Sequence, residues 1–220
     1  VQKFMSTPQM TEEDALRYFY WACAGREASD FEVIKNTINK DLREIGFQIA
    51  GVTSDFDGKR YLVLITNSGA GEEKAGSSLD AGQEIYFKKL LEHIAHRRRN
   101  GQISYGRAID FATNSKVTSL RKNFSRTAAE QAIEKLIADK WFFLDVPEGA
   151  REEYLRPSAR LQEELADFLR ESCSVENCMF CTRLCLHGLT CVNCKARAHK
   201  YCHLKRVGDR NRLVRCTKCK

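Results

Sequence analysis

The N-terminal region begins with two segments whose apolar residues recur at helical spacing. Thr11-x-x-Asp14 and Ser29-x-x-Glu32 both have the form of a capping box, which marks the start of a helix. Each box is followed by one apolar stripe at the three- and four-residue spacing of an α-helix. The first stripe consists of Leu16, Phe19, Tyr20 and Cys23, and the second of Ile34, Ile38, Leu42 and Ile45. Gly25 and Gly46 follow these stripes and predict where the two helices end.

A strand-like region follows these helices. Residues 47–53 and 60–66 are rich in β-forming residues and flank Asp57-Gly58, a dipeptide that favours a tight hairpin turn. Helices followed by a two-stranded hairpin predict a winged helix at residues 1–67. Gly, Ser and Ala are frequent in the next segment, so we expect a flexible linker at residues 68–82.

The same pattern repeats at residues 83–157. Residues 86–94 and 107–114 predict two helices, and Thr127-x-x-Glu130 is placed to cap a third. Residues 141–146 and 154–156 predict two wing strands, so this region is expected to be a second winged helix. Pro157 then marks the start of a bridging helix at residues 158–172, which docks the two parts together. Its apolar residues are Leu161, Leu165, Phe168 and Leu169.

Residues 173–220 contain four ligand pairs with a common spacing of two intervening residues. The pairs are Cys178-x2-Cys181, Cys191-x2-Cys194, His199-x2-Cys202 and Cys216-x2-Cys219. One such pair can hold a metal from a tight turn, and two pairs complete a tetrahedral zinc site. Four pairs therefore predict two structural zinc ions per chain, with no coordination position left for a catalytic water. A segment this short and polar cannot fold on its apolar residues alone, so zinc must supply much of its folding free energy.

The spacing alone allows two ways of dividing the four ligand pairs between the two zinc ions. Sequential pairing would give two separate knuckles, whereas interleaved pairing would join the first pair to the third and the second to the fourth. The order of four Cys, one His and three Cys, with four residues between Cys194 and His199, resembles the cross-brace of RING and PHD modules. That resemblance implies Cys178, Cys181, His199 and Cys202 on zinc 1, and Cys191, Cys194, Cys216 and Cys219 on zinc 2.

Other Cys and His residues fall outside this spacing. Cys23 lies on an apolar helical face and is expected to be a small core residue. The others are expected to pack or to face solvent, with replacement of Cys202 by His203 as the alternative ligand set. They are Cys173, Cys185, His187 and His203.

The composition indicates the cellular compartment and the kinds of partner to expect. Most of the ten cysteines belong to the metal pattern, which fits a reducing nuclear or cytosolic compartment. No apolar run approaches the about 18 residues of a membrane span, and no signal peptide opens the sequence as given, so no membrane contact is expected. Residues 173–220 hold eleven Lys or Arg and two Asp or Glu, whereas the rest of the chain is nearly balanced. This excess favours an acidic partner, nucleic acid among them, with a solvated surface as the commoner explanation.

The second winged helix contains candidate DNA contacts. Winged helices often bind DNA through their third helix, but here that helix, about residues 126–140, exposes a mixture of acidic, basic and amide side chains. The more basic group consists of Arg97, Arg98, Arg99, Arg107, Lys116, Arg121, Lys122 and Arg126. The alternative for this group is a solvated or protein-facing surface.

Two winged helices, a bridging helix and a C-terminal variant RING make an α+β chain that resembles a known family. The family is that of the RING-bearing non-SMC element subunits, the first numbered of that group, from the SMC complex devoted to DNA repair. The resemblance covers essentially the whole chain and is most specific in residues 178–219, including Gly188-Leu189-Thr190-Cys191 and Ala198-His199-Lys200-Tyr201-Cys202.

The resemblance implies a setting and an activity. The chain would be nuclear and chromosome-associated, would bind a MAGE-family winged-helix protein with a kleisin subunit nearby, and would attach through that subcomplex to the SMC heads. It would act in DNA recombination and repair. It would also be a RING-type ubiquitin transferase whose activity depends on the MAGE partner.

A RING ligase binds a ubiquitin-charged conjugating enzyme and holds the thioester in a reactive geometry, so no covalent catalytic residue is expected. In many RINGs the second residue after the first Cys is apolar and contacts the conjugating enzyme. Phe180 occupies that place, with burial in the core as the alternative. Lys220 matches the cation that often follows the last ligand and steadies ubiquitin. The Pro common after the first Cys of the last pair is replaced by Thr217.

Two other functions fit parts of the sequence. A non-catalytic architectural subunit would use the zinc module as a protein-binding surface. A PHD-type histone reader shares the ligand order and gaps, but such readers usually carry Trp two residues before the seventh ligand, where this sequence has Val214.

Overall fold

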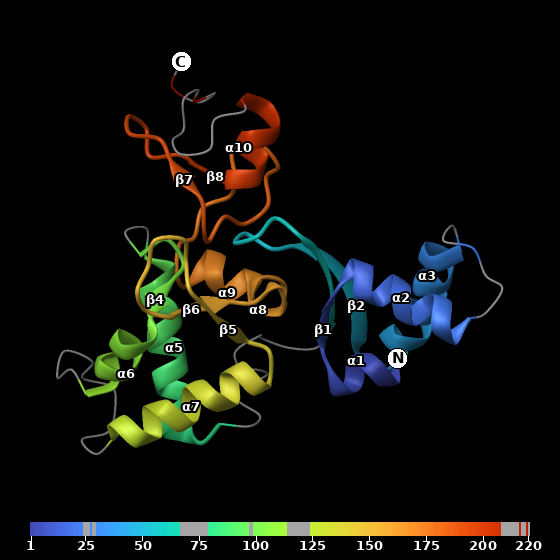
Figure 1. Ribbon diagram of the computed structural model, residues 1–220, viewed down its shortest axis with the longest axis horizontal. Helices are drawn as coiled ribbons and strands as arrows, with labels where there is room; N and C mark the ends of the chain where they lie inside the picture. Colours follow the sequence, from blue (N-terminus) through green and yellow to red (C-terminus); the bar gives the residue numbers. More distant parts are fainter. Residues whose placement is uncertain are drawn as a thin grey trace.

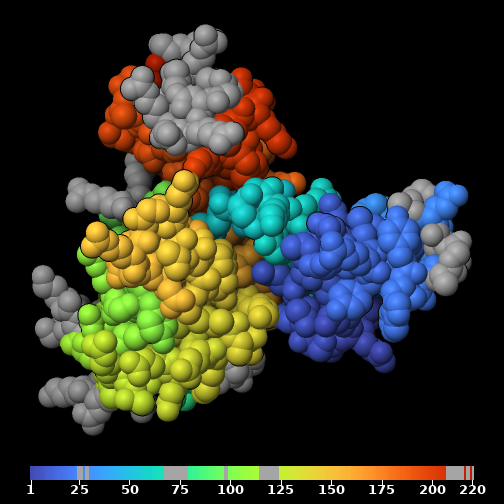
Figure 2. Space-filling view, viewed as in Figure 1, coloured from blue at the N-terminus to red at the C-terminus, as the bar shows by residue number. Residues whose placement is uncertain are grey.

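The computed structural model describes residues 1–23, 27, 30–66, 79–96, 99–113, 124–207, 216 and 219. Figure 1 shows three units: an N-terminal unit in blue to cyan, a second in green to yellow, and a C-terminal module in orange to red. The C-terminal module (residues 173–220) lies above the second unit and against the hairpin end of the first, which Figure 2 shows in cyan. Among the described residues, no helix has the length and apolar character needed to cross a membrane.

The first unit has the helix and strand order of a winged helix. Its elements are α1 (Gln2–Ser6), β1 (Gln9–Thr11), α2 (Glu12–Ala22), α3 (Asp30–Glu44), β2 (Phe47–Thr53) and β3 (Arg60–Thr66). The strands form an antiparallel sheet in the order β1-β3-β2. β2 and β3 have the bounds that the sequence predicts, whereas β1 was not predicted because three residues carry no periodic signal.

The helix caps and stripes of this unit agree only in part with the sequence. Thr11 caps α2, its side-chain oxygen accepting a hydrogen bond from the Asp14 N–H at 3.1 Å. Phe19 and Leu42 are buried as predicted, but Tyr20 is 46% exposed and Ile45 68% exposed. Periodicity identifies the apolar face of a helix, and here the packing partners cover only part of that face. The predicted cap at Ser29 and the stop at Gly25 lie outside the described residues.

The loop between β2 and β3 is longer than the predicted tight turn. Thr53 pairs with Arg60, so the loop comprises residues 54–59. Gly58 has a φ of +68°, and its N–H donates to the Ser54 carbonyl at 3.0 Å. The longer loop carries Asp55 to the C-terminal module, where its side chain is buried.

The second unit repeats the arrangement around a more extensive core. Its elements are α5 (Ala81–Ala95), β4 (Ile103–Ser104), α6 (Tyr105–Thr113), α7 (Arg126–Ala138), β5 (Phe142–Asp145) and β6 (Tyr154–Pro157), with the strands in the order β4-β6-β5. The apolar faces of all three helices pack together with Trp141 and Phe142. The α+β class and the two small sheets therefore agree with the sequence prediction.

Two predicted helix starts in this unit are wrong by a few residues. α5 begins at Ala81 behind a capping box formed by Asp80 and Gln83, so the helix starts inside the predicted linker at 68–82. α7 is capped by Ser125, whose Oγ accepts from the backbone N–H of Ala128 at 3.1 Å, and not by Thr127. Several polar residues in a row can each begin a helix, and the packing of the apolar face decides between them.

The predicted bridging helix is two short helices. α8 (Ala159–Glu164) is capped by Ser158, and α9 (Ala166–Glu171) follows. Pro157 ends β6 and does not start the helix. The side chain of Glu164, only 1% exposed, accepts from Arg160 at 2.9 Å and from the Thr66 hydroxyl at 3.1 Å. The bond from Thr66 holds the hairpin of the first winged helix against α8, whereas the bond from Arg160 lies within α8 itself.

The C-terminal module is built from β7 (Leu189–Thr190), β8 (Arg197–Ala198) and α10 (Lys200–Val207). β7 and β8 pair antiparallel. Val175, Leu184 and Leu186 from this module are buried in the apolar core of the second winged helix. The module and the second winged helix thus share one core.

Candidate metal centre

The first group of potential metal ligands consists of Cys178, Cys181, His199 and Cys202. Their ligand atoms all lie within 4.8 Å of one another. Cys178 and Cys181 flank a tight turn in which the Thr182 N–H donates to the Cys178 carbonyl at 3.0 Å. His199 directly follows β8, and Cys202 lies in the first turn of α10. A turn and a helix start therefore bring two distant pairs face to face.

The second group consists of Cys191, Cys194, Cys216 and Cys219, again with all ligand atoms within 4.8 Å. The sulfur atoms of Cys191 and Cys219 lie 3.6 Å apart, and those of Cys194 and Cys216 lie 3.3 Å apart. The Cys191 N–H donates to the Ala196 carbonyl at 2.9 Å, which closes the turn after the second pair. Along the chain, the first pair meets the third and the second meets the fourth, so the two groups are interleaved.

The distances within both groups fit tetrahedral zinc. With Zn–S of about 2.3 Å and Zn–N of about 2.0 Å, neighbouring ligand atoms should lie roughly 3.5–3.8 Å apart. His199 Nδ1 lies 3.3 Å from the sulfur of Cys181 and 3.7 Å from that of Cys202. The sulfur–sulfur distances in the second group are 3.6 and 3.3 Å, so the 3.3 Å contact in each group is slightly shorter than this range. Three thiolates with one imidazole, and four thiolates, are also donor sets that zinc prefers.

The thiols in each group differ in acidity. Backbone N–H groups in its turn lower the pKa of Cys191 to about 6, and hydrogen bonds with the other three sulfurs raise the pKa of Cys219 to about 12. Burial raises the pKa of Cys202 to about 11. Burial also acts to raise the pKa of Cys178, but hydrogen bonds from His199 and the backbone outweigh it and lower that pKa to about 6. Thiolates this close repel one another, so a cation is needed to ionise all of them together.

The imidazole of His199 is held by oxygen atoms at Nε2, the ring nitrogen that does not face the sulfurs of Cys181 and Cys202. Its Nε2 lies 2.9 Å from Asp55 Oδ1 and 2.8 Å from the Leu184 carbonyl oxygen. His199 is fully buried, and Asp55 is 5% exposed. The sequence does not reveal this contact, because an aspartate between two strands, such as Asp55, ordinarily forms part of a turn.

The second winged helix contacts the same module through Asn100, which follows α5 and has a φ of +51°. Asn100 Oδ1 accepts from the Gly188 N–H at 2.9 Å and from Arg197 Nη2 at 2.7 Å. Its carbonyl oxygen lies 2.8 Å from His187 Nδ1. At Gly188 a side chain would not fit, because a Cβ there would lie 2.3 Å from the Ala198 carbonyl oxygen. Asn100 could not be identified from the sequence either, because its partners Gly188 and Arg197 lie far along the chain.

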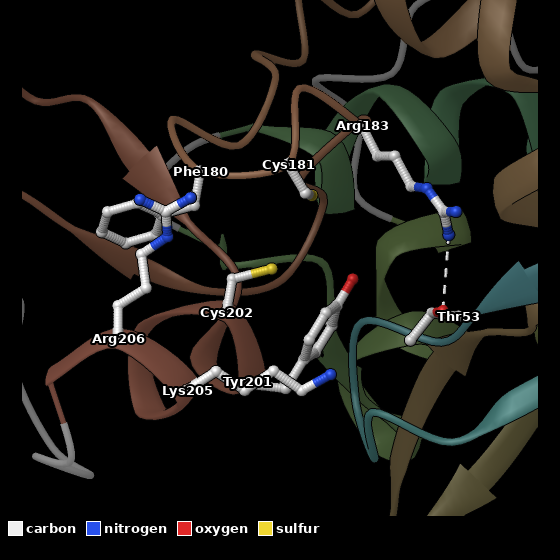
Figure 3. Close-up of a pocket in the computed structure, with 8 residues that line it drawn as sticks. All are labelled: Thr53, Phe180, Cys181, Arg183, Tyr201, Cys202, Lys205 and Arg206. Atoms are coloured by element: carbon white, nitrogen blue, oxygen red, sulfur yellow. Dashed lines mark hydrogen bonds between the residues drawn. The ribbon is translucent and has the colours of Figure 1, made fainter.

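Phe180 lies beside the first group at a pocket of about 380 Å³. The ring is half-buried, and the Arg206 guanidinium lies 5.2 Å from its centroid. Figure 3 shows Arg206 over the Phe180 ring, Lys205 on the same helix, and Arg183 reaching across to Thr53 of β2. The pocket therefore joins an aromatic ring to three cationic side chains.

The remaining Cys and His residues take varied places. Neither ring nitrogen of the buried His203 meets a hydrogen-bond partner among the described residues, and His203 is not part of either ligand group. Cys185 is fully buried in the small core beside the first group, and Cys173 packs against the core of the second winged helix. Cys23, predicted to be a core residue, is only half-buried.

Only part of the candidate DNA and ubiquitin contacts can be placed. Arg99 and Arg107 are exposed on the second winged helix, and Arg126 pairs with Asp110 at 2.6 Å. The other candidates lie outside the described residues: Arg97, Arg98, Lys116, Arg121, Lys122 and Lys220. Val214 and Thr217, where the sequence departs from the PHD and RING patterns, also lie outside them.

Comparison with known proteins gives two matches. The family model for the Nse1 non-SMC component of the SMC5-6 complex matches residues 1–150. A chain in a solved structure titled "Nse1-Nse3-Nse4 complex" has the same fold, with a TM-score of 0.80 and 20% sequence identity over 99% of this chain and 91% of that chain. A search of curated protein sequences returned no match. The family match ends before the two ligand groups, which rest on the sequence spacing and the geometry described above. The chain belongs to the family of Nse1 non-SMC components of the SMC5-6 complex.

Proposed function

We propose that this chain is a zinc-bearing, RING-type ubiquitin ligase subunit of the SMC5-6 complex. The observation that carries the proposal is the pair of interleaved Cys/His groups beside two winged helices in a chain of the Nse1 family. Zinc 1 is bound by Cys178, Cys181, His199 and Cys202, and zinc 2 by Cys191, Cys194, Cys216 and Cys219. With four protein ligands each, both ions serve as structural cross-links and leave no position for an activated water.

The chain's part in ubiquitin transfer is to position a ubiquitin-charged conjugating enzyme. Bringing the thioester and its acceptor together in a fixed orientation lowers the barrier without any covalent bond to the ligase. Phe180 is the proposed contact, because its ring borders the pocket beside α10 and its backbone is fixed between Cys178 and Cys181. Lys220 is assigned the contact with ubiquitin on the resemblance alone.

The proposed partners are a MAGE-family Nse3 and a kleisin Nse4, through which the chain reaches the SMC heads. They are supported by the similar chain in the Nse1-Nse3-Nse4 complex. The first winged helix offers a matching surface: a groove of about 490 Å³ lined largely by apolar side chains from α1, α2 and α3. Tyr18 and Trp21, which line the groove, are 45% and 84% exposed, and Tyr20 of the same helix is 46% exposed. Aromatic residues gathered on a surface in this way are typical of protein–protein interfaces.

Membership of the Nse1 family supports a nuclear location and a role in DNA recombination and repair, which we propose for this chain. Direct DNA contact is proposed through the basic group of the second winged helix, where Arg99 and Arg107 are exposed. Arginine side chains supply the salt-dependent contact with phosphate that DNA binding requires. Arg97, Arg98, Arg121 and Lys122 complete this group in the sequence.

Ubiquitin discharge from a charged conjugating enzyme tests the ligase proposal. The zinc-loaded chain is assayed alone and in a complex with its MAGE partner. We expect slow discharge alone and faster discharge in the complex, with the gain lost when Cys178→Ser removes a ligand of zinc 1. A zinc-loaded complex that gives no acceleration with any conjugating enzyme would show that the chain is not a ligase.

The alternative is a non-catalytic architectural subunit, and two observations favour it. Arg206 lies over the Phe180 ring and occupies the surface that a conjugating enzyme would use. Asn100 and Asp55 also tie the module to both winged helices, as expected for a rigid interaction platform. Under this alternative the complex assembles normally and discharge stays at the background rate.

A further inference from the structure

Asp55 links the first winged helix to the C-terminal module, and ubiquitin transfer as proposed above gives this residue no role. It belongs to the β2–β3 loop of the first winged helix, yet its carboxylate is buried within the C-terminal module. Oδ2 accepts from the backbone N–H of Leu186 at 2.8 Å and of His187 at 3.1 Å, and Oδ1 lies 2.9 Å from His199 Nε2. A buried carboxylate is strongly unfavourable unless hydrogen bonds replace its hydration, and these three donors do so.

We propose that Asp55 is a positioning residue for zinc 1, and that it makes zinc retention at that site depend on the docking of the first winged helix. The proposal rests on the zinc binding proposed above. It assigns a role in the metal centre to a residue outside both ligand groups.

The contacts of His199 fix its tautomer. Nε2 faces two acceptors, Asp55 Oδ1 and the Leu184 carbonyl, so the ring proton belongs on that nitrogen. A proton on Nε2 leaves the lone pair of Nδ1 free, and Nδ1 faces the sulfurs of Cys181 and Cys202. A histidine that binds zinc through one nitrogen usually donates the other N–H to a carboxylate or carbonyl, which fixes the ring and strengthens the ligand.

The same loop also supports the plane of the His199 ring, through Tyr201. The Tyr201 ring stacks on the His199 ring, with centroids 4.8 Å apart and planes inclined by 7°. Gly58 of the loop packs against Tyr201 so closely that an added Cβ would lie 3.1 Å from the Tyr201 Cβ. The loop therefore fixes His199 by a hydrogen bond at its edge and through Tyr201 on its face.

The loop itself is held by α8 and by the C-terminal module. The Asp55 N–H donates to Gln162 Oε1 of α8 at 3.2 Å, and Arg183 of the C-terminal module reaches Thr53 Oγ1 at 3.4 Å. The Asp55 contact thus forms when the first winged helix is docked on α8 and on the module. Two events that share one contact must favour each other, so zinc binding and docking are linked in both directions.

The second zinc site provides an internal control. The turn that carries Cys191 and Cys194 is closed by its own backbone, with Cys191 N–H bonded to Ala196 at 2.9 Å and Lys195 N–H bonded to Cys191 at 3.1 Å. A change at Asp55 should therefore act on zinc 1 and leave zinc 2 unaffected.

Zinc release from the full-length holoprotein to an excess of chromogenic chelator tests the proposal. The variants are Asp55→Ala and Asp55→Asn, which keeps the shape but places an NH2 donor against another donor. The matched control is Asp57→Asn in the same loop. Among the described residues, exposed Asp57 bonds only within its own hairpin, to Lys59 N–H at 3.0 Å and the Tyr61 hydroxyl at 2.8 Å. If Asp55→Ala fails to fold, the zinc release of Asp55→Asn alone tests the proposal.

In both Asp55 variants we expect one zinc per chain to leave about 10–100-fold faster, the usual effect of losing such a partner on metal affinity. The other zinc and both zincs of the control should leave at the wild-type rate. Imidazole NMR supplies a readout that general loss of stability would not mimic. In the wild type His199 should show a metal-bound Nδ1 and a slowly exchanging proton on Nε2, and in Asp55→Asn that proton should exchange rapidly.

Unchanged release of both zincs in Asp55→Asn, or equal acceleration of both, would overturn the positioning role. Removal of zinc should also increase amide hydrogen exchange in residues 47–66, and unchanged exchange there would refute the linkage to docking. A wild-type chain that holds no zinc would instead refute the zinc binding on which the proposal rests, so the two failures are distinguishable.

Discussion

At the scale of single residues, the metal ligands and the side chains that support them differ in what the sequence reveals. The eight ligands stand out because chelation requires a fixed local spacing, and a spacing of two residues is visible in the chain itself. Asp55 and Asn100 act over long sequence distances, on His199 and on Arg197. Nothing near either residue in the sequence indicates that contact, and only the packing of whole units creates it.

Phe180→Ala tests the proposed contact with the conjugating enzyme. Truncating a well-packed contact residue costs about 2 kcal/mol or more, roughly thirtyfold in affinity. Because Cys178 and Cys181 fix the backbone on both sides, we expect two zincs, a nearly unchanged melting temperature and markedly slower ubiquitin discharge in the MAGE-bound complex. Arg206→Met, which removes the cation over the ring while keeping an extended side chain, is the matched variant at the same pocket.

These measurements show whether Phe180 contacts the conjugating enzyme or belongs to the core of the module. If zinc content, melting temperature and discharge all fall together in Phe180→Ala, Phe180 is a core residue of the module. An unchanged discharge rate in the folded, zinc-loaded variant would remove Phe180 from the contact surface.

At the scale of elements, the sequence predicts the two longest strands better than helix starts. β2 and β3 have their predicted bounds because a run of β-forming residues is bounded on both sides by turn residues. α7 begins at Arg126 under a cap from Ser125, although Thr127 also stands in a capping-box pattern. The choice depends on which register buries Ala129, Ala132, Ile133 and Leu136, which is a property of the whole unit.

The two polar residues at the start of α7 give a matched pair of variants. Ser125→Ala removes the side-chain oxygen that accepts from the Ala128 N–H and should lower the free energy of unfolding by about 1 kcal/mol. Thr127→Ala removes an exposed side chain within the first turn and should have little effect. Chemical denaturation followed by circular dichroism measures both. A larger loss for Thr127→Ala than for Ser125→Ala would contradict the assigned cap.

At the scale of the whole molecule, the C-terminal module is joined to both winged helices in different ways. It shares an apolar core with the second, through Val175, Leu184 and Leu186, and it accepts Asp55 from the first. The apolar stripes and the ligand spacing predicted units that fold separately. The shared core could not be seen in the sequence, because Leu184 and Leu186 lie among potential ligands in a segment without helical or strand periodicity.

Leu186→Ala tests the shared core. Leu186 is fully buried, and truncation of such a residue costs about 2–5 kcal/mol. Because its neighbours belong to the second winged helix, we expect that unit to lose stability together with the module. The emission of Trp141, 2% exposed, reports on this core, whereas Trp21, the other tryptophan, is 84% exposed. Early loss of zinc with an unchanged Trp141 transition would contradict a common core.

The central claim is that two zincs bind in an interleaved arrangement, and native mass spectrometry of two double variants tests it most directly. The wild-type chain should carry two zincs. Cys178→Ser/Cys202→Ser removes ligands from one interleaved site and should leave one zinc, whereas Cys178→Ser/Cys191→Ser damages both sites and should leave none. Sequential pairing predicts the reverse for the two variants. That reversed result, or a wild-type chain with fewer than two zincs after gentle purification, would contradict the account.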